Sequence, residues 1–394
     1  MHDGIAPEGT AFPVRRRERS LRDEQSCRRQ GPCRPPRVSC DAATPSMDTP
    51  GRWSSKQMRM TLKKIGSQVI VITGATSGVG LLAARKAASR GAKLVLAARG
   101  EEALHQLAEQ LRETGSEVIT VPTDVGDLQA VKALAQAAIE RFGGFDTWVN
   151  NAGVTIYGRY NEVPVEDQRK LFDTNYWGVV HGSLVAAAHL RERGGAIINM
   201  GSEASDVPLP LQSAYAASKH AIKGFTDSLR LELEQERAPV SVTLIKPAAL
   251  DTPFASHAKN YLDVEPELAP PVYDPEMAAE AILFAAEHPR RDMFVGAASK
   301  AMSSAAYHMP GLYDRVMRRF LGRAQCTARP AGPRENNALF QATNDLVERE
   351  GRRHVVRTCP YTASTRHPVM TGAMVVGASL ALAAALGMRR TRMR

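Results

Sequence analysis

Short runs of apolar, mostly β-branched residues alternate with longer stretches of helical periodicity from about residue 68 to residue 295. Each run is short enough for a buried strand, and each stretch between two runs can form a helix. Strands joined by helical crossovers lie parallel in a sheet that is covered on both faces. We therefore predict a doubly wound α/β domain, a Rossmann fold with a single parallel seven-stranded sheet. The runs are Val69–Thr73, Lys93–Ala98, Val118–Val121, Thr147–Asn150, Ala196–Met200, Val240–Ile245 and Met293–Val295.

The residues before this pattern have a different composition. Residues 1–60 are rich in Arg, Pro, Ser and Gly and show no apolar periodicity. Such a segment cannot bury a core, so we predict a disordered basic tail. It is either an attachment for an acidic surface, or a solvated extension or over-long start, and we favour the second interpretation. No linker-like break interrupts residues 61–298, which we predict to be one catalytic domain.

Residues 299–366 are predicted to form a helical and loop extension at the C-terminal side of the domain. An amphipathic helix is indicated near residue 317, with arginines on its other faces. A basic amphipathic helix can lie on a membrane surface. Alternatively, its apolar stripe docks on the domain or lines a substrate cleft. The apolar positions are Tyr313, Val316, Met317, Phe320 and Leu321, and the arginines are Arg315, Arg318, Arg319 and Arg323.

Residues 369–388 form a run of 20 residues without a charge. This length spans a bilayer core, so residues 367–394 are predicted to be a C-terminal transmembrane helix with a basic end. The alternative is an Ala/Gly-rich helix that packs on the domain or between subunits. We expect a membrane-associated protein with its catalytic domain in the cytoplasm, and otherwise a cytoplasmic one. The arginines after residue 388 favour a C-terminus in the cytoplasm as well. A helix that crosses the bilayer once cannot leave both the catalytic domain and the C-terminus on that side.

Charge and cysteine content exclude several classes of protein. The formal net charge is +10, but the excess lies mostly in the two ends of the chain. Nothing resembles a recognition helix or a stacking platform, so we predict no nucleic-acid partner. The five cysteines include no Cys-x-x-Cys pair, so neither a disulfide framework nor a metal site is expected.

A glycine-rich loop follows the first predicted strand. Thr73–Gly80 reads TGATSGVG and leads into a helical stretch. Glycines let the backbone turn tightly and approach a pyrophosphate, while a helix N-terminus offers unpaired N–H groups to the anion. Because the loop lies between a strand and a helix at the start of an α/β pattern, it predicts a dinucleotide site.

The second predicted strand, Lys93–Ala98, is followed directly by Arg99 instead of an acidic residue. An acid at this place accepts hydrogen bonds from the ribose 2′-hydroxyl, whereas an arginine pairs with a 2′-phosphate. We therefore predict NADP(H) as the cofactor.

Three further side chains suit proton transfer. Tyr215 and Lys219 are four residues apart at the start of a helical pattern, so both project from one face. A nearby ammonium stabilises a tyrosinate and is expected to lower the phenol pKa, which makes Tyr215 an acid in reduction and a base in oxidation. Ser202 follows a predicted strand at the carboxyl end of the sheet, where its hydroxyl can bond a carbonyl oxygen.

Together these motifs resemble the short-chain dehydrogenase/reductase family over about Lys64 to Val295. The order of the motifs matches, and Ser202 lies thirteen residues before Tyr215. The matching motifs are TGxxxGxG at Thr73–Gly80, Asp124-Val125, NNAG at Asn150–Gly153, Asn175 in DTNYWG, Ser202, and YxxxK at Tyr215–Lys219.

The resemblance implies a catalytic tetrad of Asn175, Ser202, Tyr215 and Lys219. It implies that Asn175 holds a water linking Lys219 to solvent. It further implies that Asp124 contacts the adenine amine and Thr252 the nicotinamide carboxamide. The residues expected to bind the cofactor are Thr73, Gly74, Thr76, Ser77, Gly78, Val79, Gly80, Arg99, Asp124, Val125, Asn151, Ala152, Gly153, Tyr215, Lys219, Pro247 and Thr252.

One position departs from the family pattern. Ala248 stands where the PGxxxT segment has its glycine, and an alanine there is strained if the backbone needs a positive φ.

The resulting hypothesis is an NADP(H)-dependent oxidoreductase that interconverts a carbonyl and an alcohol. The apolar loop 206–211, the late amphipathic helix and the apolar run 369–388 favour a lipid, a steroid or a long-chain carbonyl compound. The alternative is a non-catalytic NADP-binding sensor or membrane scaffold of the same fold. A homo-oligomer is expected from the resemblance.

Overall fold

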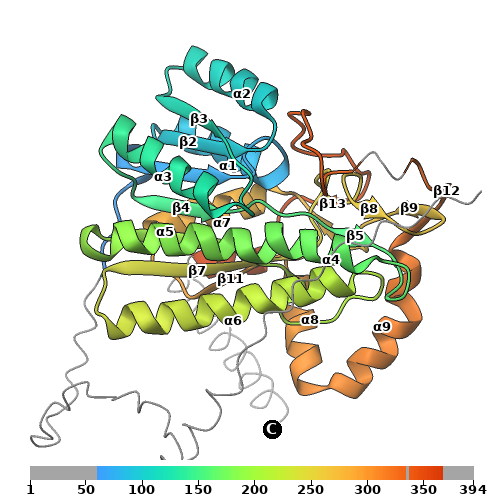
Figure 1. Ribbon diagram of the computed structural model, residues 1–394. Helices are drawn as coiled ribbons and strands as arrows, with labels where there is room; N and C mark the ends of the chain where they lie inside the picture. The colour runs from blue at the N-terminus through green and yellow to red at the C-terminus, as the bar shows by residue number, and fades with distance from the viewer. Residues whose placement is uncertain (1–59, 334–336, 367–394) are drawn as a thin grey trace, which may run out of the picture. The chain divides into compact units, whose positions relative to one another are not determined.

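The computed structural model describes residues 60–333 and 337–366. Its centre is a parallel sheet of seven strands in the order β11-β7-β6-β4-β1-β2-β3 (Figure 1). All seven predicted strands are confirmed, with ends that differ by at most two residues. The strands are β1 Val69–Thr73, β2 Lys93–Ala98, β3 Val118–Pro122, β4 Thr147–Asn150, β6 Gly195–Met200, β7 Val240–Pro247 and β11 Asp292–Val295.

Helices cover both faces of the sheet, as the apolar strands require. In β1, Ile70 and Ile72 belong to the core under one helical layer, whereas Val71 belongs to the core under the other. Both faces of the strand are therefore buried, which is why the run contains no polar alternation. One layer contains α1 Gly78–Ser89, α2 Glu101–Glu113 and α7 Glu276–Glu287. The other contains α3 Leu128–Phe142, α5 Gly178–Arg193 and α6 Ser213–Gln235, with α4 Val165–Phe172 next to α6.

The chain changes direction across the sheet between β1 and β4. From β1 it proceeds outward to β2 and β3, and it then returns to β4 and continues to β6, β7 and β11. The crevice at the carboxyl ends of such strands is where open α/β sheets bind their ligands. This point lies between Thr73, the last residue of β1, and Asn150, the last residue of β4.

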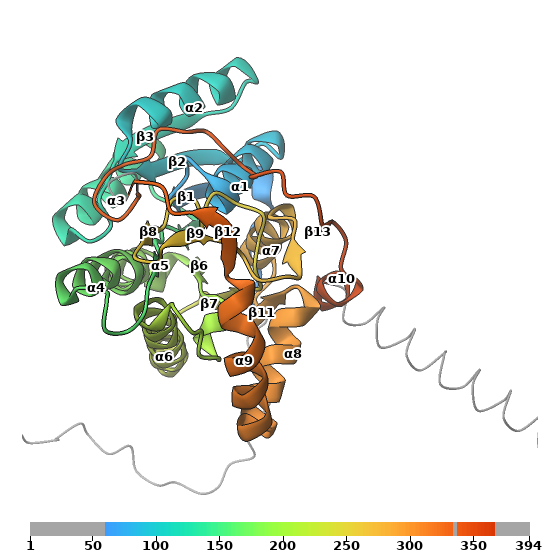
Figure 2. The same ribbon diagram turned by 90° about the vertical axis from the view of Figure 1, so that its right-hand side faces the viewer.

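The C-terminal extension adds helices and short strands to the domain. The predicted amphipathic helix is confirmed as α9 Pro310–Ala324, which forms a projecting hairpin with α8 Ala297–His308 (Figures 1 and 2). The predicted helical and loop extension, residues 299–366, also contains two short strands that pair with strands of the domain. The extension adds β12 Cys326–Pro330, which pairs with β9 Val264–Pro266 of the domain, β13 Val355–Val356, which pairs with β10 Val272–Tyr273 of the domain, and α10 Pro360–Arg366. A further short pair, β5 Ile156–Tyr157 with β8 Lys259–Asn260, lies within the domain.

The predicted transmembrane helix, residues 369–388, lies outside the described residues, as does the basic tail up to residue 59. Within residues 60–333 and 337–366, no helix combines the length and the apolar character needed to cross a bilayer. The cytoplasmic location and the homo-oligomer stay predictions.

Candidate active site

The loop between β1 and α1 needs its glycines for steric reasons. Gly74 has a φ of 64° and Gly78 a φ of 51°, in the region that L side chains rarely adopt. A Cβ placed on Gly80 would lie 2.1 Å from the carbonyl oxygen of Gly74, so any side chain there would push the loop away from the helix. The glycine spacing therefore fixes the close approach of loop and helix.

The NNAG segment is fastened directly to this loop. The Asn151 side chain donates to the carbonyl oxygens of Thr73 at 3.0 Å and Gly74 at 3.1 Å. The Thr73 hydroxyl in turn accepts from the backbone N–H groups of Asn151 and Ala152. Gly74, Asn151 and Ala152 line the cleft. Thr73 and Gly80 do not line it and instead support these residues from behind.

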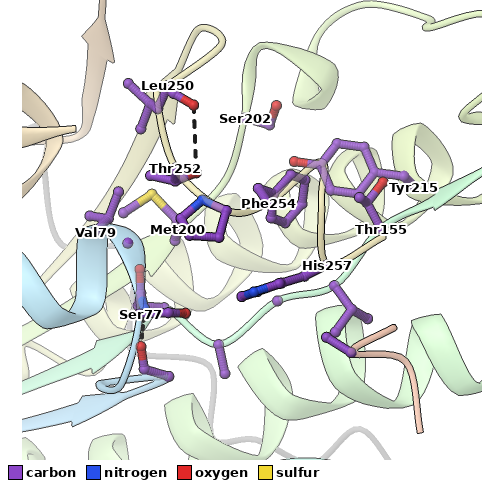
Figure 3. Close-up of a pocket in the computed structure, with 18 of the residues that line it drawn as sticks. Ser77, Val79, Thr155, Met200, Ser202, Tyr215, Leu250, Thr252, Phe254 and His257 are labelled. Atoms are coloured by element: carbon purple, nitrogen blue, oxygen red, sulfur yellow. Dashed lines mark hydrogen bonds between the residues drawn. The ribbon is translucent and has the colours of Figure 1, made fainter. Parts of the chain in front are cut away.

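Ser202, Tyr215 and Lys219 line one cavity at the carboxyl ends of the strands, continuous with the glycine loop. Figure 3 shows Ser202, Tyr215 and Phe254 gathered at one side of this cavity and Ser77 and Val79 at the other. The Lys219 ammonium lies 5.7 Å from the centre of the Tyr215 ring and donates to the carbonyl oxygen of Met200 at 2.9 Å. The structure thus brings these three side chains together at one cavity.

The pKa values of this group differ from the expectation. Burial raises the pKa of the Tyr215 phenol to about 12, although a hydrogen bond with Ser202 lowers it, and the charge of Glu203 raises it further. Burial also lowers the pKa of Lys219 to about 8. The prediction that the tyrosine pKa lies below its usual value is therefore wrong, because desolvation of the buried phenol outweighs the hydrogen bond with Ser202.

Asn175 lies behind the cavity and does not line it. It belongs to a π-helical turn, Asp173–Trp177, between α4 and α5, a distortion often found at functional sites. Its side chain accepts from the N–H of Val154 and donates to the Val154 carbonyl and to Ser218. A Cβ placed on Gly153 would lie 3.5 Å from Asn175 Oδ1 and 3.8 Å from Lys219 Nζ, so the two side chains flank that glycine.

The segment after β7 reaches the cavity without strain. Pro247, Ala248 and Thr252 line it, and the methyl group of Thr252 would be 3.1 Å from a Cβ on Gly78. Among the described residues other than glycine, only Leu211 and Arg237 have positive φ. Ala248 therefore tolerates the backbone conformation, and the strain considered for this substitution is not present.

The nucleotide end of the cleft includes a segment that sequence reasoning missed. Arg99 lines the cavity with Thr76, Ser77, Asp124 and Val125, but its guanidinium donates to backbone carbonyls of the C-terminal extension. The acceptors are the carbonyl oxygens of Ala338, Leu339 and Gln341.

The same segment contacts the glycine loop. Gly78 N–H donates to the Val347 carbonyl at 2.9 Å, and His257 pairs with Asp345 at 2.8 Å. Figure 2 shows the chain between β12 and β13 running past β3 and β2 toward α1. Residues 337–347 have no apolar periodicity, so no signal in the sequence placed them here.

The other half of the cavity is mostly apolar. Leu209, Phe254, Leu268 and Leu321 line it, together with Glu203, Gln212 and Gln325. Leu321 comes from α9, which supports the alternative that this helix lines a cleft. Glu203 is not among the site residues predicted from the sequence, because an acidic residue after a strand is usually solvated.

The donors along the cleft suit a dinucleotide with its reactive end beside Tyr215. The glycine loop leaves room for a pyrophosphate at the start of α1, and Ser77, the residue before the helix, makes no side-chain cap bond there. A carbonyl oxygen placed near Ser202 and Tyr215 would meet two hydroxyl donors. The arrangement therefore fits hydride transfer between a nicotinamide and a carbonyl carbon.

Residues 68–262 match the family model described as short chain dehydrogenase. A Bacillus subtilis (strain 168) protein named as the uncharacterized oxidoreductase YxnA is 47% identical over 323 residues, covering 81% of this chain and 91% of that protein. The 11-beta-hydroxysteroid dehydrogenase A of Sesamum indicum is 38% identical over 190 residues, covering 48% of this chain and 54% of that protein.

Solved structures show the same fold. A short chain dehydrogenase/reductase from Burkholderia phymatum in complex with NAD is 31% identical with a TM-score of 0.56, covering 70% of this chain and 98% of that one. A short chain dehydrogenase from Burkholderia cenocepacia J2315 in complex with NADP is 26% identical with a TM-score of 0.55, covering 65% of this chain and 99% of that one. The chain belongs to the short-chain dehydrogenase/reductase family and is an oxidoreductase of that family.

Proposed function

We propose that the protein is an NADP(H)-dependent oxidoreductase that interconverts an apolar carbonyl compound and its alcohol. The observation that carries this proposal is the meeting of Ser202, Tyr215 and Lys219 in one cavity with the glycine loop. A sensor without catalysis would not need a buried phenol and a buried ammonium side by side. The alternative of a non-catalytic protein is therefore disfavoured.

When bound, the reduced nicotinamide supplies a hydride to the carbonyl carbon and is itself oxidised. Ser202 donates a hydrogen bond to the carbonyl oxygen as negative charge develops there. Tyr215 gives that oxygen its proton, and the Lys219 ammonium beside the ring stabilises the tyrosinate that remains. Asn175 fixes the backbone of Val154 from behind, which holds the wall of the cleft in place. In the reverse direction Tyr215 accepts the proton.

NADPH oxidation tests this proposal. The purified chain is assayed with linear long-chain ketones and aldehydes, steroid ketones, and small polar ketones as a comparison. We expect turnover of at least one apolar class. Tight NADPH binding without turnover of any carbonyl would instead favour the sensor.

Arg99 is proposed to select NADP(H) over NAD(H). Three of the roughly five guanidinium N–H groups bond to carbonyls of residues 338–341, which leaves two for a 2′-phosphate. Arg99→Ala is expected to weaken NADPH binding by about 10- to 100-fold, since charge-assisted hydrogen bonds are lost, and to leave NADH binding almost unchanged. Fluorescence titration with both cofactors measures this. An equal loss for both would show that Arg99 only holds the C-terminal segment.

We also propose that α9 rests on an anionic lipid surface. Leu312, Val316 and Phe320 form an exposed apolar stripe, with Phe320 61% exposed. The neighbouring Arg315, Arg319 and Arg323 are exposed too. Among the residues that the structure describes, these three arginines have no carboxylate partner. Exposed apolar side chains beside unpaired cations match a surface of anionic headgroups.

A tryptophan reporter on α9 tests this contact in the full chain. The tryptophan introduced by Phe320→Trp is expected to be quenched by brominated lipid in anionic vesicles. The quenching should be weaker in neutral vesicles. Leu184→Trp, at an exposed position on α5, serves as the control and is expected to show no quenching. Equal quenching at both positions, or none at Phe320→Trp, would rule out docking through α9.

A further inference from the structure

The substrate half of the cavity holds a carboxyl group that the proposed mechanism does not use. Glu203 begins a short 3-10 helix, Glu203–Ser205, directly after Ser202 and lines the same cavity as Tyr215. Within the described part of the chain, its carboxylate forms no hydrogen bond and no ion pair. It is thus a strong hydrogen-bonding group, next to the catalytic hydroxyls, whose partner must come from whatever fills the cavity.

The surroundings make an unpaired carboxyl unfavourable. Leu209, Phe254 and Leu321 line this half of the cavity, and burial raises the pKa of Glu203 to about 7. A polar group in an apolar cavity is stabilised only by a hydrogen-bond partner, either water or a ligand. A carboxyl near its pKa can accept a hydrogen bond or donate one.

A second polar group in the same cavity is also unpartnered. Gln325 Nε2 donates to Gln212 Oε1 at 2.8 Å, and Gln212 Nε2 donates to the Thr155 hydroxyl at 2.9 Å. This chain of bonds uses the Gln325 amide nitrogen and leaves its Oε1 as an acceptor. That oxygen is buried without a hydrogen-bond partner among the described residues, and Gln325 itself is 3% exposed.

We propose that Glu203 and Gln325 recognise a second polar group on the substrate, so that the preferred substrate is an apolar ketone or alcohol with an additional hydroxyl group. A hydroxyl can donate to either acceptor. A cationic amine is disfavoured, because the Lys219 ammonium lines the same cavity. The proposal rests on the oxidoreductase function and adds the substrate class to it.

The expected discrimination follows from the bonds. A ketone that lacks the additional hydroxyl would displace water from Glu203 without replacing its hydrogen bond. The loss of one hydrogen bond to a charged group lowers kcat/KM by about 10- to 100-fold. The difference should appear mainly in KM, since the additional hydroxyl takes no part in hydride or proton transfer and is bound equally in the ground state and the transition state.

Matched ketone pairs test the proposal in the full chain. Each pair consists of a ketone with an additional hydroxyl and its deoxy analogue: 3- and 4-hydroxycyclohexanone against cyclohexanone, and hydroxylated steroid ketones against the deoxy forms. We expect wild type to prefer the hydroxylated member of at least one pair by about 10-fold or more. Glu203→Leu should abolish that preference, Glu203→Gln should keep part of it, and Gln325→Leu should reduce it. Glu232→Leu, which removes an exposed carboxyl on α6, should leave it unchanged.

NADPH titration of each variant separates folding from recognition. The proposed recognition site is contradicted if wild type turns over both members of every pair equally. It is also contradicted if Glu203→Leu binds NADPH and keeps the full preference. In both cases the oxidoreductase function stands. If wild type binds NADPH but reduces none of the ketones, the proposed function fails, and the recognition site fails with it.

Discussion

Replacement of Tyr215 by phenylalanine is expected to reduce kcat for carbonyl reduction by about 10²- to 10⁴-fold, the range that a positioned general acid contributes. The ring stays in place, because it packs against Phe254 at 5.5 Å between ring centres, so only the proton donor is lost. NADPH affinity should therefore remain close to that of wild type. Steady-state kinetics and a fluorescence titration of the same preparation measure both quantities.

Tyr313→Phe is the matched control for this variant. Tyr313 is also buried, and in the described part of the chain its hydroxyl has no hydrogen-bond partner, so the loss of that hydroxyl should change neither activity nor stability much. Comparable turnover in Tyr215→Phe and wild type would remove Tyr215 from the mechanism.

Lys219→Met is expected to abolish most of the turnover and, at the same time, to stabilise the fold. The ammonium is buried with one hydrogen bond, to the Met200 carbonyl, so its desolvation is poorly compensated at neutral pH. The lowering of its pKa from 10.5 to about 8 corresponds to an unfavourable contribution of up to about 3 kcal/mol, which an apolar side chain of similar length avoids. Thermal unfolding at pH 7 and NADPH oxidation, measured together, test the two effects.

The pH dependence of stability provides the control for Lys219→Met. Between about pH 8 and pH 10.5, Lys219 has lost its proton in the folded state but keeps it in the unfolded state. The unfolded state then binds more protons than the folded state. The free energy of unfolding of wild type therefore increases as pH rises through that window. The variant lacks this gain. A variant less stable than wild type at pH 7 would show that the Met200 hydrogen bond outweighs desolvation.

The sheet could be predicted because each strand carries its own signal. A strand such as β1 is buried on both faces, so its apolar run is visible without knowledge of its neighbours. The glycine loop was equally visible, since Gly74 and Gly80 meet a local steric requirement. The proposed catalytic positions followed from motif order, and the structure brings Ser202, Tyr215 and Lys219 to one cavity.

Features that depend on distant packing could not be predicted. The carbonyls that bind Arg99 belong to an aperiodic segment about 240 residues later, and nothing local marks them. The direction of the Tyr215 pKa was wrong because sequence spacing reveals the neighbouring ammonium but not the degree of burial. Glu203 was missed for a similar reason, since an acidic residue after a strand is usually solvated.

The bond between Gly78 and Val347 has a consequence for the order in which the molecule matures during synthesis. Its two residues are 347 − 78 = 269 positions apart, so the glycine loop leaves the ribosome long before its partner exists. Domains begin to fold from the N-terminal side as the chain is made. The wall of the nucleotide cleft formed by residues 337–347 is therefore among the last parts to be completed, and a nascent or truncated chain that ends before them presents an open cleft.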